Sequence, residues 1–445
     1  MFKKILVANR GEIAVRIIRA CREMGIATVA VYSEPDKNAL HAALADERIC
    51  IGPASAVQSY LNMQNIISAA LATHAEAIHP GYGFLSENSL FAALCVQNDI
   101  VFIGPESEVI DRMGNKDQAR RLMISAGVPV IPGSGVVKDV TAAKKAAAKI
   151  GYPLLVKASA GGGGKGIRIV EREEDLEKSV VAACEEAKKA FGCGDVFLEK
   201  YLTSVRHVEV QILADQAGNV VCLGERDCSL QIGRQKVIEE TPCPAIDESV
   251  RKKLWEAAVK AVKAAKYTNA GTVEFLLAPD GNFYFIEMNT RLQVEHRISE
   301  EVSGIDLVKW QIRIASQIEL PFKQEDIRLH GASIECRINA AGGGKVSFLH
   351  IPGGTRVSFD TALVQNAEVT PFYDSMIGKL ITAGNDREEA VRKMEAALCE
   401  LVISGVPTNI EKQSEIIRSP EFHGAEYDTA WLQRKMKNEE IKNKN

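Results

Sequence analysis

The chain has 445 residues, of which 46% are hydrophobic and 25% charged, and its formal net charge is −4. This is the profile of a globular protein of two or three domains with a large core. The balanced charge argues against a nucleic-acid partner, and no apolar run reaches the roughly 18 residues of a membrane span.

The first 113 residues alternate strand and helix patterns. "KKILVANRGEIAVRIIRACREMGIATVAVYS" is typical of a strand, a turn, an amphipathic helix ended by Gly25, and a second buried strand. "AEAIHPGYGFLSEN" and "DIVFIGP" continue the alternation. We therefore expect a parallel, Rossmann-like sheet covered by helices over residues 1–113. The turn "ANRGE" has a single glycine and is not a dinucleotide-binding fingerprint.

Residues 114–204 are predicted to form a linker and a small unit with a glycine loop. "YPLLVKASAGGGGKGIRIVERE" reads as strand, loop and strand. "GGGGKG" at 161–166 matches G-x-G-x-x-G, but a strand follows in place of a helix, and Lys165 precedes Gly166 rather than Ser or Thr, so the dinucleotide and Walker-A interpretations fail. We expect a flap whose backbone N–H groups lie over phosphates, with Lys157 within reach; a merely flexible hairpin tip is the alternative.

Residues 205–445 are predicted to form a mixed C-terminal domain. Two aromatic-rich strands, "GTVEFLL" and "GNFYFIEMN", flank the turn "APDGN". Glu274 and Glu287 would then lie on neighbouring strands, where two carboxylates need a cation between them. Together with Asn289 they offer the oxygen ligands that suit Mg²⁺ or Mn²⁺.

The second of these strands is followed by a row of polar residues. If the chain stays extended, its period of two puts five of them on one side: Glu287, Asn289, Arg291, Gln293 and Glu295. The near end of the row would bind metal and the far end would hold and activate a small anion. An ordinary solvated strand face is the alternative.

The ten cysteines are scattered without any C-x-x-C pair, and the eight histidines show no metal-ligand spacing. The start of the chain lacks the apolar stretch and cleavage site of a signal peptide. We therefore expect reduced thiols and a cytoplasmic location.

Several motifs together resemble the biotin carboxylase family of the ATP-grasp superfamily. They cover nearly the whole chain: "LVANRGEIAVRIIRA", "HPGYGFLSEN", "FIGP", "KASAGGGGKG", "EKYL", "RHVEVQ", "ERDCS", "EMNTRLQVEH", "ECRINA" and "YDSMIGKL". The resemblance implies an α/β (α+β overall) ATP-grasp fold with a Rossmann-like N-terminal domain, a small mobile ATP-binding lid and a mixed C-terminal domain.

The resemblance also implies an activity and partners. The activity is the ATP-dependent carboxylation of biotin on a biotin carboxyl carrier protein, with bicarbonate, through carboxyphosphate. This is the first half-reaction of acetyl-CoA carboxylase in fatty acid synthesis, so carboxyltransferase subunits and a homodimer are expected. No "AMKM"-like biotinylation motif is present, which favours a free-standing subunit.

Individual roles follow from the same resemblance. ATP phosphates are expected to contact Lys116, Lys157, Gly163 and Gly164. The adenine and ribose are expected near Glu199, Lys200, Leu202, His207 and Gln231, and Glu274 and Glu287 are expected to bind ATP through the metal, with Asn289 as a third ligand. The bicarbonate site corresponds to Lys236, Arg291, Gln293 and Val294, and the base to Glu295. Biotin is expected to contact Arg337 and Tyr82.

The sequence departs from the family pattern in three places. Ile232–Arg234 replace a basic run ending in His, with Arg234 able to supply the charge to the nucleotide. Arg297 stands where Pro is usual, which would free the backbone after Glu295. The Gly-rich segment around 341–352 is shortened, so we expect it to be loosely built or reshaped.

Three other interpretations stay open at this point. One is an ATP-grasp ligase that makes an acyl phosphate from a different acid. Another is a nicotinamide-dependent oxidoreductase that uses the glycine loop, and the third is a non-catalytic regulatory relative.

Overall fold

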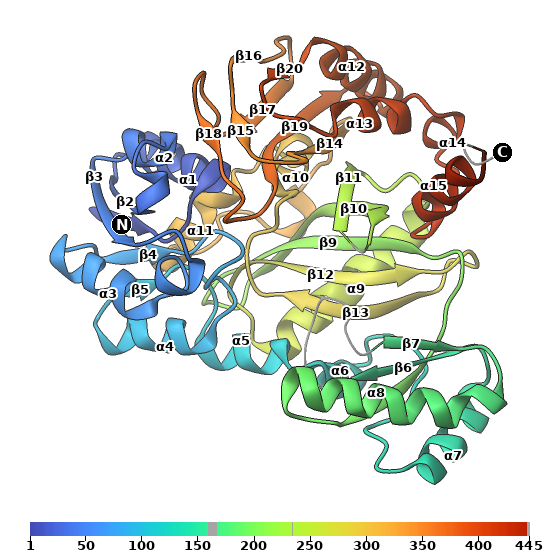
Figure 1. Ribbon diagram of the computed structural model, residues 1–445. Coiled ribbons are helices and arrows are strands. Elements are labelled where there is room, and N and C mark those ends of the chain that lie inside the picture. The colour runs from blue at the N-terminus through green and yellow to red at the C-terminus, as the bar shows by residue number, and fades with distance from the viewer. Residues whose placement is uncertain (159–166, 234, 443–445) are drawn as a thin grey trace.

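The computed structural model describes residues 1–158, 167–233 and 235–442 (Figure 1). Its N-terminal part contains a five-stranded parallel sheet with the strand order β3-β2-β1-β4-β5. The strands are β1 (Lys4–Val7), β2 (Ala27–Ser33), β3 (Glu47–Gly52), β4 (Ala77–His79) and β5 (Val101–Phe102). The expected Rossmann-like parallel sheet is confirmed.

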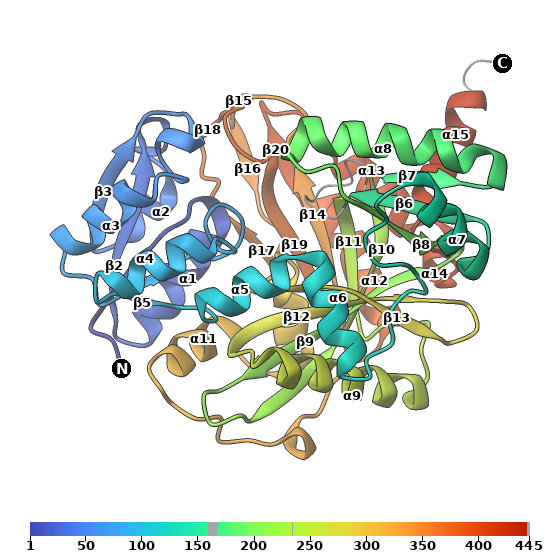
Figure 2. The ribbon, with the colours of Figure 1, turned by 90° about the horizontal axis from the view of Figure 1, so that it is seen from below.

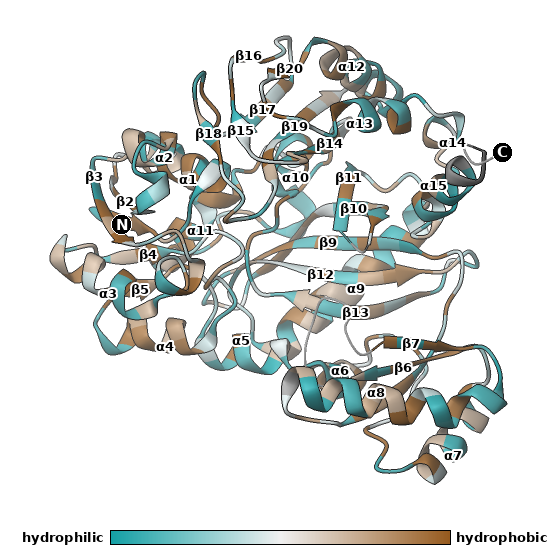
Figure 3. Ribbon diagram, in the orientation of Figure 1, coloured by the Kyte–Doolittle hydropathy of each residue, from teal (hydrophilic) through white to brown (hydrophobic). Residues whose placement is uncertain are grey.

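Helices cover both faces of this sheet. They are α1 (Gly11–Glu23), α2 (Leu40–Leu44), α3 (Met63–Ala72) and α4 (Ser89–Gln97), joined by α11 (Leu307–Ala315) from far along the chain. Ile5 and Val7 pack with α1 and α11, whereas Leu6 packs with α3 and α4, as the strand period of two requires. Gly25 follows α1 with φ 72°, the left-handed conformation that glycine adopts at low cost. Figure 3 shows these strands mostly in the hydrophobic colour.

A small three-stranded unit follows the linking helices α5 (Ser107–Gly114) and α6 (Lys116–Ser125). Its strands are β6 (Leu154–Ala158), β7 (Ile167–Val170) and β8 (Val196–Lys200), in the order β7-β6-β8, with α7 (Val140–Ile150) and α8 (Leu176–Phe191) packed against them. β6 and β7 pair antiparallel, with Lys157 opposite Ile167. The two predicted strands are therefore present, and the glycine loop predicted between them falls on residues 159–166, outside the described part of the chain.

An eight-stranded antiparallel sheet lies between these two parts, which stand on opposite sides of the molecule in Figures 1 and 2. Its order is β13-β12-β9-β10-β11-β14-β19-β17. The strands are β9 (Arg206–Ala214), β10 (Val220–Ile232), β11 (Gln235–Thr241), β12 (Asn269–Leu277), β13 (Phe283–Asn289), β14 (Ala332–Asn339), β17 (Val357–Thr361) and β19 (Met376–Gly384). Glu274 pairs with Glu287 across β12 and β13, so the predicted hairpin register is confirmed.

The remaining α-helices surround this sheet. The helices are α9 (Glu248–Ala265), α10 (His296–Ser303), α12 (Arg387–Glu400), α13 (Ile410–Ile417), α14 (Pro420–His423) and α15 (Trp431–Lys442). Short 3₁₀ helices are η1 (Glu34–Asp36), η2 (Ala56–Gln58), η3 (Glu173–Asp175) and η4 (Gln324–Asp326). No helix in the described ranges is long and apolar enough to cross a bilayer.

The Gly-rich segment around 341–352 is built rather than loose. It forms β15 (Gly344–Lys345), paired with β18 (Glu368–Val369), and β16 (Phe348–His350), paired with β20 (Val402–Ser404). Between the strands Val346 is fully buried. The expectation of a loose segment is therefore wrong. Its glycines allow many backbone conformations, but backbone hydrogen bonds to two distant segments select one of them.

Candidate active site

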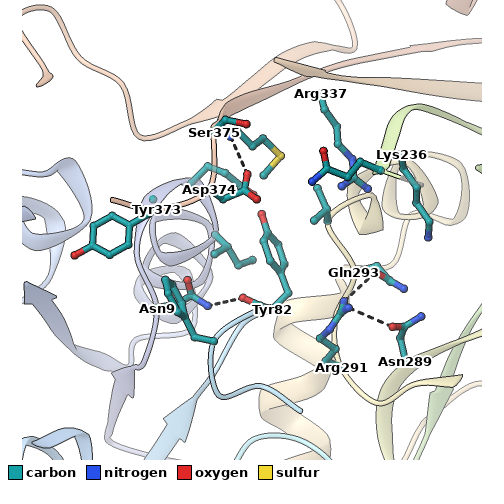
Figure 4. A pocket seen from close by; sticks show the side chains of 18 of the residues that line it. Asn9, Tyr82, Lys236, Asn289, Arg291, Gln293, Arg337, Tyr373, Asp374 and Ser375 are labelled. Atoms are coloured by element: carbon teal, nitrogen blue, oxygen red, sulfur yellow. Dashed lines mark hydrogen bonds between the residues drawn. The ribbon is translucent and has the colours of Figure 1, made fainter. Parts of the chain in front are cut away.

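A cavity of about 620 Å³ lies where the N-terminal sheet, the large sheet and the turn after β13 meet (Figure 4). Ten of the residues predicted to act in the site line it: Tyr82, His207, Lys236, Glu274, Glu287, Asn289, Arg291, Gln293, Val294 and Arg337. They come from segments up to 255 residues apart in the chain, between Tyr82 and Arg337. A concave site on which several polar and ionisable side chains converge is a candidate small-molecule centre.

The polar row predicted from the period of two is not one continuous strand. β13 ends at Asn289, and the chain turns before α10 begins at His296. Glu295, at the start of that helix, has φ −81° and ψ 14°, which is not extended backbone. The prediction was wrong beyond Asn289, because the alternating pattern continues through a turn in which Leu292 is fully buried. Nevertheless the turn brings Arg291 and Gln293 to the same cavity.

Lys236, near the start of β11, lies at the centre of a cluster of carboxylates. Its Nζ is 2.6 Å from Glu209 Oε2, 3.0 Å from Glu274 Oε1 and 2.7 Å from Glu295 Oε1. Burial lowers the pKa of Lys236, but the negative groups around it more than offset this effect, so the net pKa is well above its usual value. The lysine is therefore a permanent cation at the wall of the cavity.

Glu295 is fully buried between two cations. Its Oε1 accepts from Lys236 and its Oε2 accepts from Arg337 Nη2 at 2.9 Å. Burial raises the pKa of Glu295, but Lys236 and Arg337 outweigh it, and the net pKa is well below 4.5. The carboxylate is thus ionised, as predicted, although the cations in contact with it are Lys236 and Arg337 rather than Arg291.

Arg291 is fixed by a fork of hydrogen bonds. Its Nε donates to Glu87 Oε2 at 2.8 Å, while its two terminal nitrogens donate to Gln293 Oε1 at 2.9 Å and to Asn289 Oδ1 at 3.2 Å. Figure 4 shows the last two bonds, with the guanidinium lying between the two amides. A planar fork held in this way suits an anionic ligand.

Glu274 and Glu287 each have a cation of their own. Glu274 is contacted by Lys236 and lies 2.9 Å from His207 Nε2, whereas Glu287 Oε2 lies 3.8 Å from Lys116 Nζ. Burial and the charge of Glu274 raise the pKa of Glu287. The two carboxylates face each other as predicted, and within the described part of the chain Glu287 makes one long ion pair.

Other predicted nucleotide residues lie away from the cavity wall, in the small three-stranded unit. Lys157 Nζ is in contact with Glu199 Oε2, and Lys200 Nζ donates to the carbonyl of Tyr152 at 2.8 Å. Leu202 is half-buried just after β8.

The rest of the predicted nucleotide set is only partly described. Gln231 lies beside His207, with Nε2 2.9 Å from His207 Nδ1. Gly163, Gly164 and Arg234 are outside the described residues.

Arg297, which stands where Pro is usual, is held by ion pairs rather than left loose. Its guanidinium pairs with Glu300 at 2.7 Å, with Glu301 at 3.3 Å and with Asp360 at 3.2 Å. These partners come from α10 and from β17 on the large sheet, so the start of α10 is anchored to the sheet by charge.

Sequence reasoning missed several residues that line the cavity: Asn9, Arg10, Glu12, Phe84, Tyr373, Asp374 and Met376. It also missed Glu87, which holds Arg291. Most lie inside motifs that had been noticed, "ANRGE", "HPGYGFLSEN" and "YDSMIGKL", so the motifs themselves were the signal. No spacing along the chain shows that these three segments meet.

Comparison with known proteins identifies the family. Residues 1–110 match the family described as "Biotin carboxylase, N-terminal domain", residues 115–323 match "Carbamoyl-phosphate synthase L chain, ATP binding domain", and residues 335–434 match "Biotin carboxylase C-terminal domain". The chain belongs to the biotin carboxylase family. Its activity is therefore that of a ligase, the ATP-dependent carboxylation of biotin.

Relatives within this family have different full names. Biotin carboxylase 1 of Bacillus subtilis is 51% identical, over 97% of this chain and 98% of its own length. The 2-oxoglutarate carboxylase small subunit of Hydrogenobacter thermophilus is 49% identical, over 97% of this chain and 93% of its own length. The family name therefore does not by itself fix the final acceptor of the carboxyl group.

Solved structures agree with the fold. The biotin carboxylase beta-gamma-ATP complex from Campylobacter jejuni has a TM-score of 0.94 and 49% identity, covering 98% of this chain and 99% of its own. The biotin carboxylase domain dimer of Hydrogenobacter thermophilus 2-oxoglutarate carboxylase, in complex with MgADP, ADP and bicarbonate, has a TM-score of 0.92 and 48% identity, covering 98% of each chain. The ATP-grasp fold is confirmed.

Proposed function

We propose that this chain carboxylates biotin on a biotin carboxyl carrier protein by way of carboxyphosphate, made from ATP and bicarbonate. The observation that carries the proposal is that three cations line a single cavity, Lys236, Arg291 and Arg337, and that two of them, Lys236 and Arg337, bind the buried carboxylate of Glu295 behind its wall. Such cations suit an anion that must attack a phosphoryl group, where catalysis consists mainly of positioning and charge stabilisation. The carboxylate between two of them can take the proton that bicarbonate loses.

ATP would lie between the cavity and the small three-stranded unit, which would serve as its lid. Its phosphates would contact Lys116, Lys157, Gly163 and Gly164, its adenine Glu199, Lys200 and Leu202, and its ribose His207 and Gln231, with Arg234 supplying charge nearby. The contact between Lys157 and Glu199, on the paired strands β6 and β8, supports their approach to one nucleotide. Closure of the lid would exclude water from a labile mixed anhydride.

Glu274, Glu287 and Asn289 would hold Mg²⁺ or Mn²⁺. The donor set fits, because all three offer hard oxygen atoms, and the ion pair that the described residues give Glu287, with Lys116 at 3.8 Å, is long and readily replaced by a metal ion. Repulsion from Glu274, which raises the pKa of Glu287, would be relieved by a divalent ion. When bound, the metal would neutralise charge on the phosphates of ATP.

The turn after β13 and Lys236 would form the bicarbonate site. Lys236 and Arg291, with Gln293 and Val294, would hold the anion. Glu295 would take its proton while the bicarbonate oxygen attacks the γ-phosphorus, and ADP would leave. The carboxyl group of carboxyphosphate would then pass to the ureido nitrogen of biotin, and the phosphate that is released would carry away the N–H proton of that nitrogen. Arg337 would stabilise the enolate-like form of the biotin ring, and Tyr82 would lie beside it.

We further propose that the complete reaction is that of acetyl-CoA carboxylase in fatty acid synthesis. The partners would be the carrier protein and carboxyltransferase subunits, and the chain would act as a homodimer. Support comes from relatives named simply biotin carboxylase that match over 98–99% of their own length, and from the dimeric neighbour. All ten cysteines are free thiols, which favours a cytoplasmic location.

The activity is tested by following ADP release with MgATP, with and without bicarbonate and free biotin. Turnover that needs bicarbonate and rises with biotin supports the proposal. Equal rates with and without biotin would favour the rival ligase that makes another acyl phosphate.

The final acceptor is tested separately, by reconstitution with a biotinylated carrier and labelled bicarbonate. Transfer of label to acetyl-CoA by an acetyl-CoA carboxyltransferase supports the proposed pathway. Transfer only with transferases for pyruvate or 2-oxoglutarate would contradict it and leave the biotin half-reaction intact.

A further inference from the structure

A second buried lysine lies behind the proposed bicarbonate site. Lys379, on β19, is fully buried, and its Nζ donates to the main-chain carbonyl of Val294 at 2.7 Å. A buried ammonium is costly unless it is well partnered. Burial lowers the pKa of Lys379, but Glu12, Glu335 and Asp360 more than offset this, so the pKa is raised and the group stays charged.

Lys379 stands directly opposite Arg337 in the register between β19 and β14. The two side chains hold consecutive residues of the turn: Arg337 donates to the side chain of Glu295, and Lys379 to the carbonyl just before it. That carbonyl and the N–H of Glu295 belong to one planar peptide group. Fixing the carbonyl therefore fixes the direction of the peptide that joins the anion-binding turn to α10.

Glu12 connects this arrangement to the N-terminal part of the molecule. It lies in the first turn of α1, lines the cavity, and places Oε1 3.4 Å from Lys379 Nζ. The ring centre of Tyr82 lies 5.9 Å from the same nitrogen. Three contacts from distant segments thus surround one ammonium group, and neither Lys379 nor Glu12 has a role described above for bicarbonate, biotin or ATP.

We propose that Lys379 is a positioning residue for the bicarbonate site, and that Glu12 holds its ammonium group in place. The inference rests on the proposed function only in naming bicarbonate as the anion. Loss of Lys379 would leave the Val294 carbonyl without its donor, so the turn that carries Arg291 and Gln293 would sample other peptide orientations. Binding of the anion would weaken, whereas ATP, which contacts other elements, would bind as before.

The test is Lys379→Met, which keeps the length of the side chain and removes its charge and donors. We expect the bicarbonate KM to rise about tenfold, as for a lost hydrogen bond to a charged group, with the ATP KM changed by less than about twofold. The matched control is Lys393→Met. Lys393 also donates to a main-chain carbonyl, that of Ala383 at 3.0 Å, and pairs with Glu389 at 2.9 Å, but its carbonyl partner lies on β19 and not in the anion-binding turn. Its bicarbonate KM should be unchanged.

A double variant separates positioning from stability. Lys379→Met leaves the Glu12 carboxyl group buried without its cation; burial already raises its pKa to about 7, so it must take up a proton or stay as an uncompensated charge, and the melting temperature should fall. Adding Glu12→Gln removes that buried charge and should recover much of the melting temperature. Because the Val294 carbonyl still lacks a donor, the bicarbonate KM should stay raised.

The outcomes are distinct. A raised bicarbonate KM in the folded double variant, Lys379→Met with Glu12→Gln, supports the positioning role. This test remains valid if the single variant Lys379→Met does not fold. A normal bicarbonate KM in the double variant overturns that role, as does an equal rise for Lys393→Met. Absence of any bicarbonate dependence in the unsubstituted chain overturns the proposed function instead.

Discussion

The sharpest prediction concerns Glu295, the carboxylate that we propose takes the proton of bicarbonate. Glu295→Gln keeps the size of the side chain and one oxygen acceptor. It removes the charge that lies between Lys236 Nζ, at 2.7 Å, and Arg337 Nη2, at 2.9 Å. The NH₂ group of the new glutamine would lie against the N–H groups of Lys236 or Arg337, so two hydrogen-bond donors would face each other.

The magnitude follows from burial. Glu295 is fully buried, and breaking one side of a buried ion pair costs roughly 3–5 kcal/mol. Glu209 and Glu239 remain to compensate Lys236 and Arg337, so we expect a loss at the lower end, about 3 kcal/mol in the free energy of unfolding. Turnover should fall by on the order of 10²-fold or more, as for a lost general base.

The depressed pKa of Glu295 adds a condition to this mechanism. A carboxylate with a pKa well below 4.5 is always ionised but is a weak base. Bicarbonate that binds Lys236 would draw this cation away from Glu295 and raise its basicity. The general base would therefore become effective only when the anion is bound, and ATP hydrolysis without bicarbonate should be slow.

The assay measures melting temperature beside biotin-stimulated turnover per folded molecule. The control is Glu225→Gln, since Glu225 is equally buried and paired with Arg251 at 3.0 Å and with Trp255 at 3.0 Å, away from the cavity. It should lose stability and keep its turnover. A stable and fully active Glu295→Gln enzyme would refute the base assignment, and so would equal losses of turnover in both variants.

Further predictions follow from the same contacts. The folded pKa of Glu295 is lowered, so the stability that its carboxylate contributes is present above its unfolded pKa of about 4.3 and is lost as the pH falls through the folded value. The difference in free energy of unfolding between the unsubstituted chain and Glu295→Gln should therefore be constant from about pH 6 to 8 and should shrink in acid. Glu287→Gln should raise the Mg²⁺ concentration needed for half-maximal turnover by about tenfold, because an amide is a weaker ligand; normal metal dependence would remove it from the site. Glu87→Gln should raise the bicarbonate KM about threefold by weakening its 2.8 Å bond to the arginine of the turn, and an unchanged KM would contradict that role. A thiol reagent should label the exposed Cys50 and Cys399 first, since burial raises the pKa of buried thiols such as Cys21 to about 12; early labelling of Cys21 would contradict the core packing.

The sequence by itself determined the local elements and the identity of the reactive groups. The parallel sheet of residues 1–113 follows from strand and helix periods that each span a few residues. The pairing of the two strands next to the Asp280-Gly281 turn follows from that turn, whereas the exact pairing of Glu274 with Glu287 depends on a register shift between Glu274 and Phe275 that the turn does not specify. The charged residues of the motifs could also be named as site residues from the sequence, because the charge and the hydrogen-bonding groups of a side chain are fixed by its residue type.

The tertiary structure decided where the polar row ends and which partners each charge has. An alternating pattern fits both a strand and a turn with Leu292 turned into the core, and only packing against α10 and the sheet distinguishes them. The lysine of β11 contacts three carboxylates that lie 27, 38 and 59 residues away in the chain, and Lys379 contacts the carbonyl of Val294, 85 residues away, and Glu12 at the other end of the sequence. The local periodicity of the sequence cannot predict such contacts, because the energy of a buried charge depends on every group that surrounds it in three dimensions.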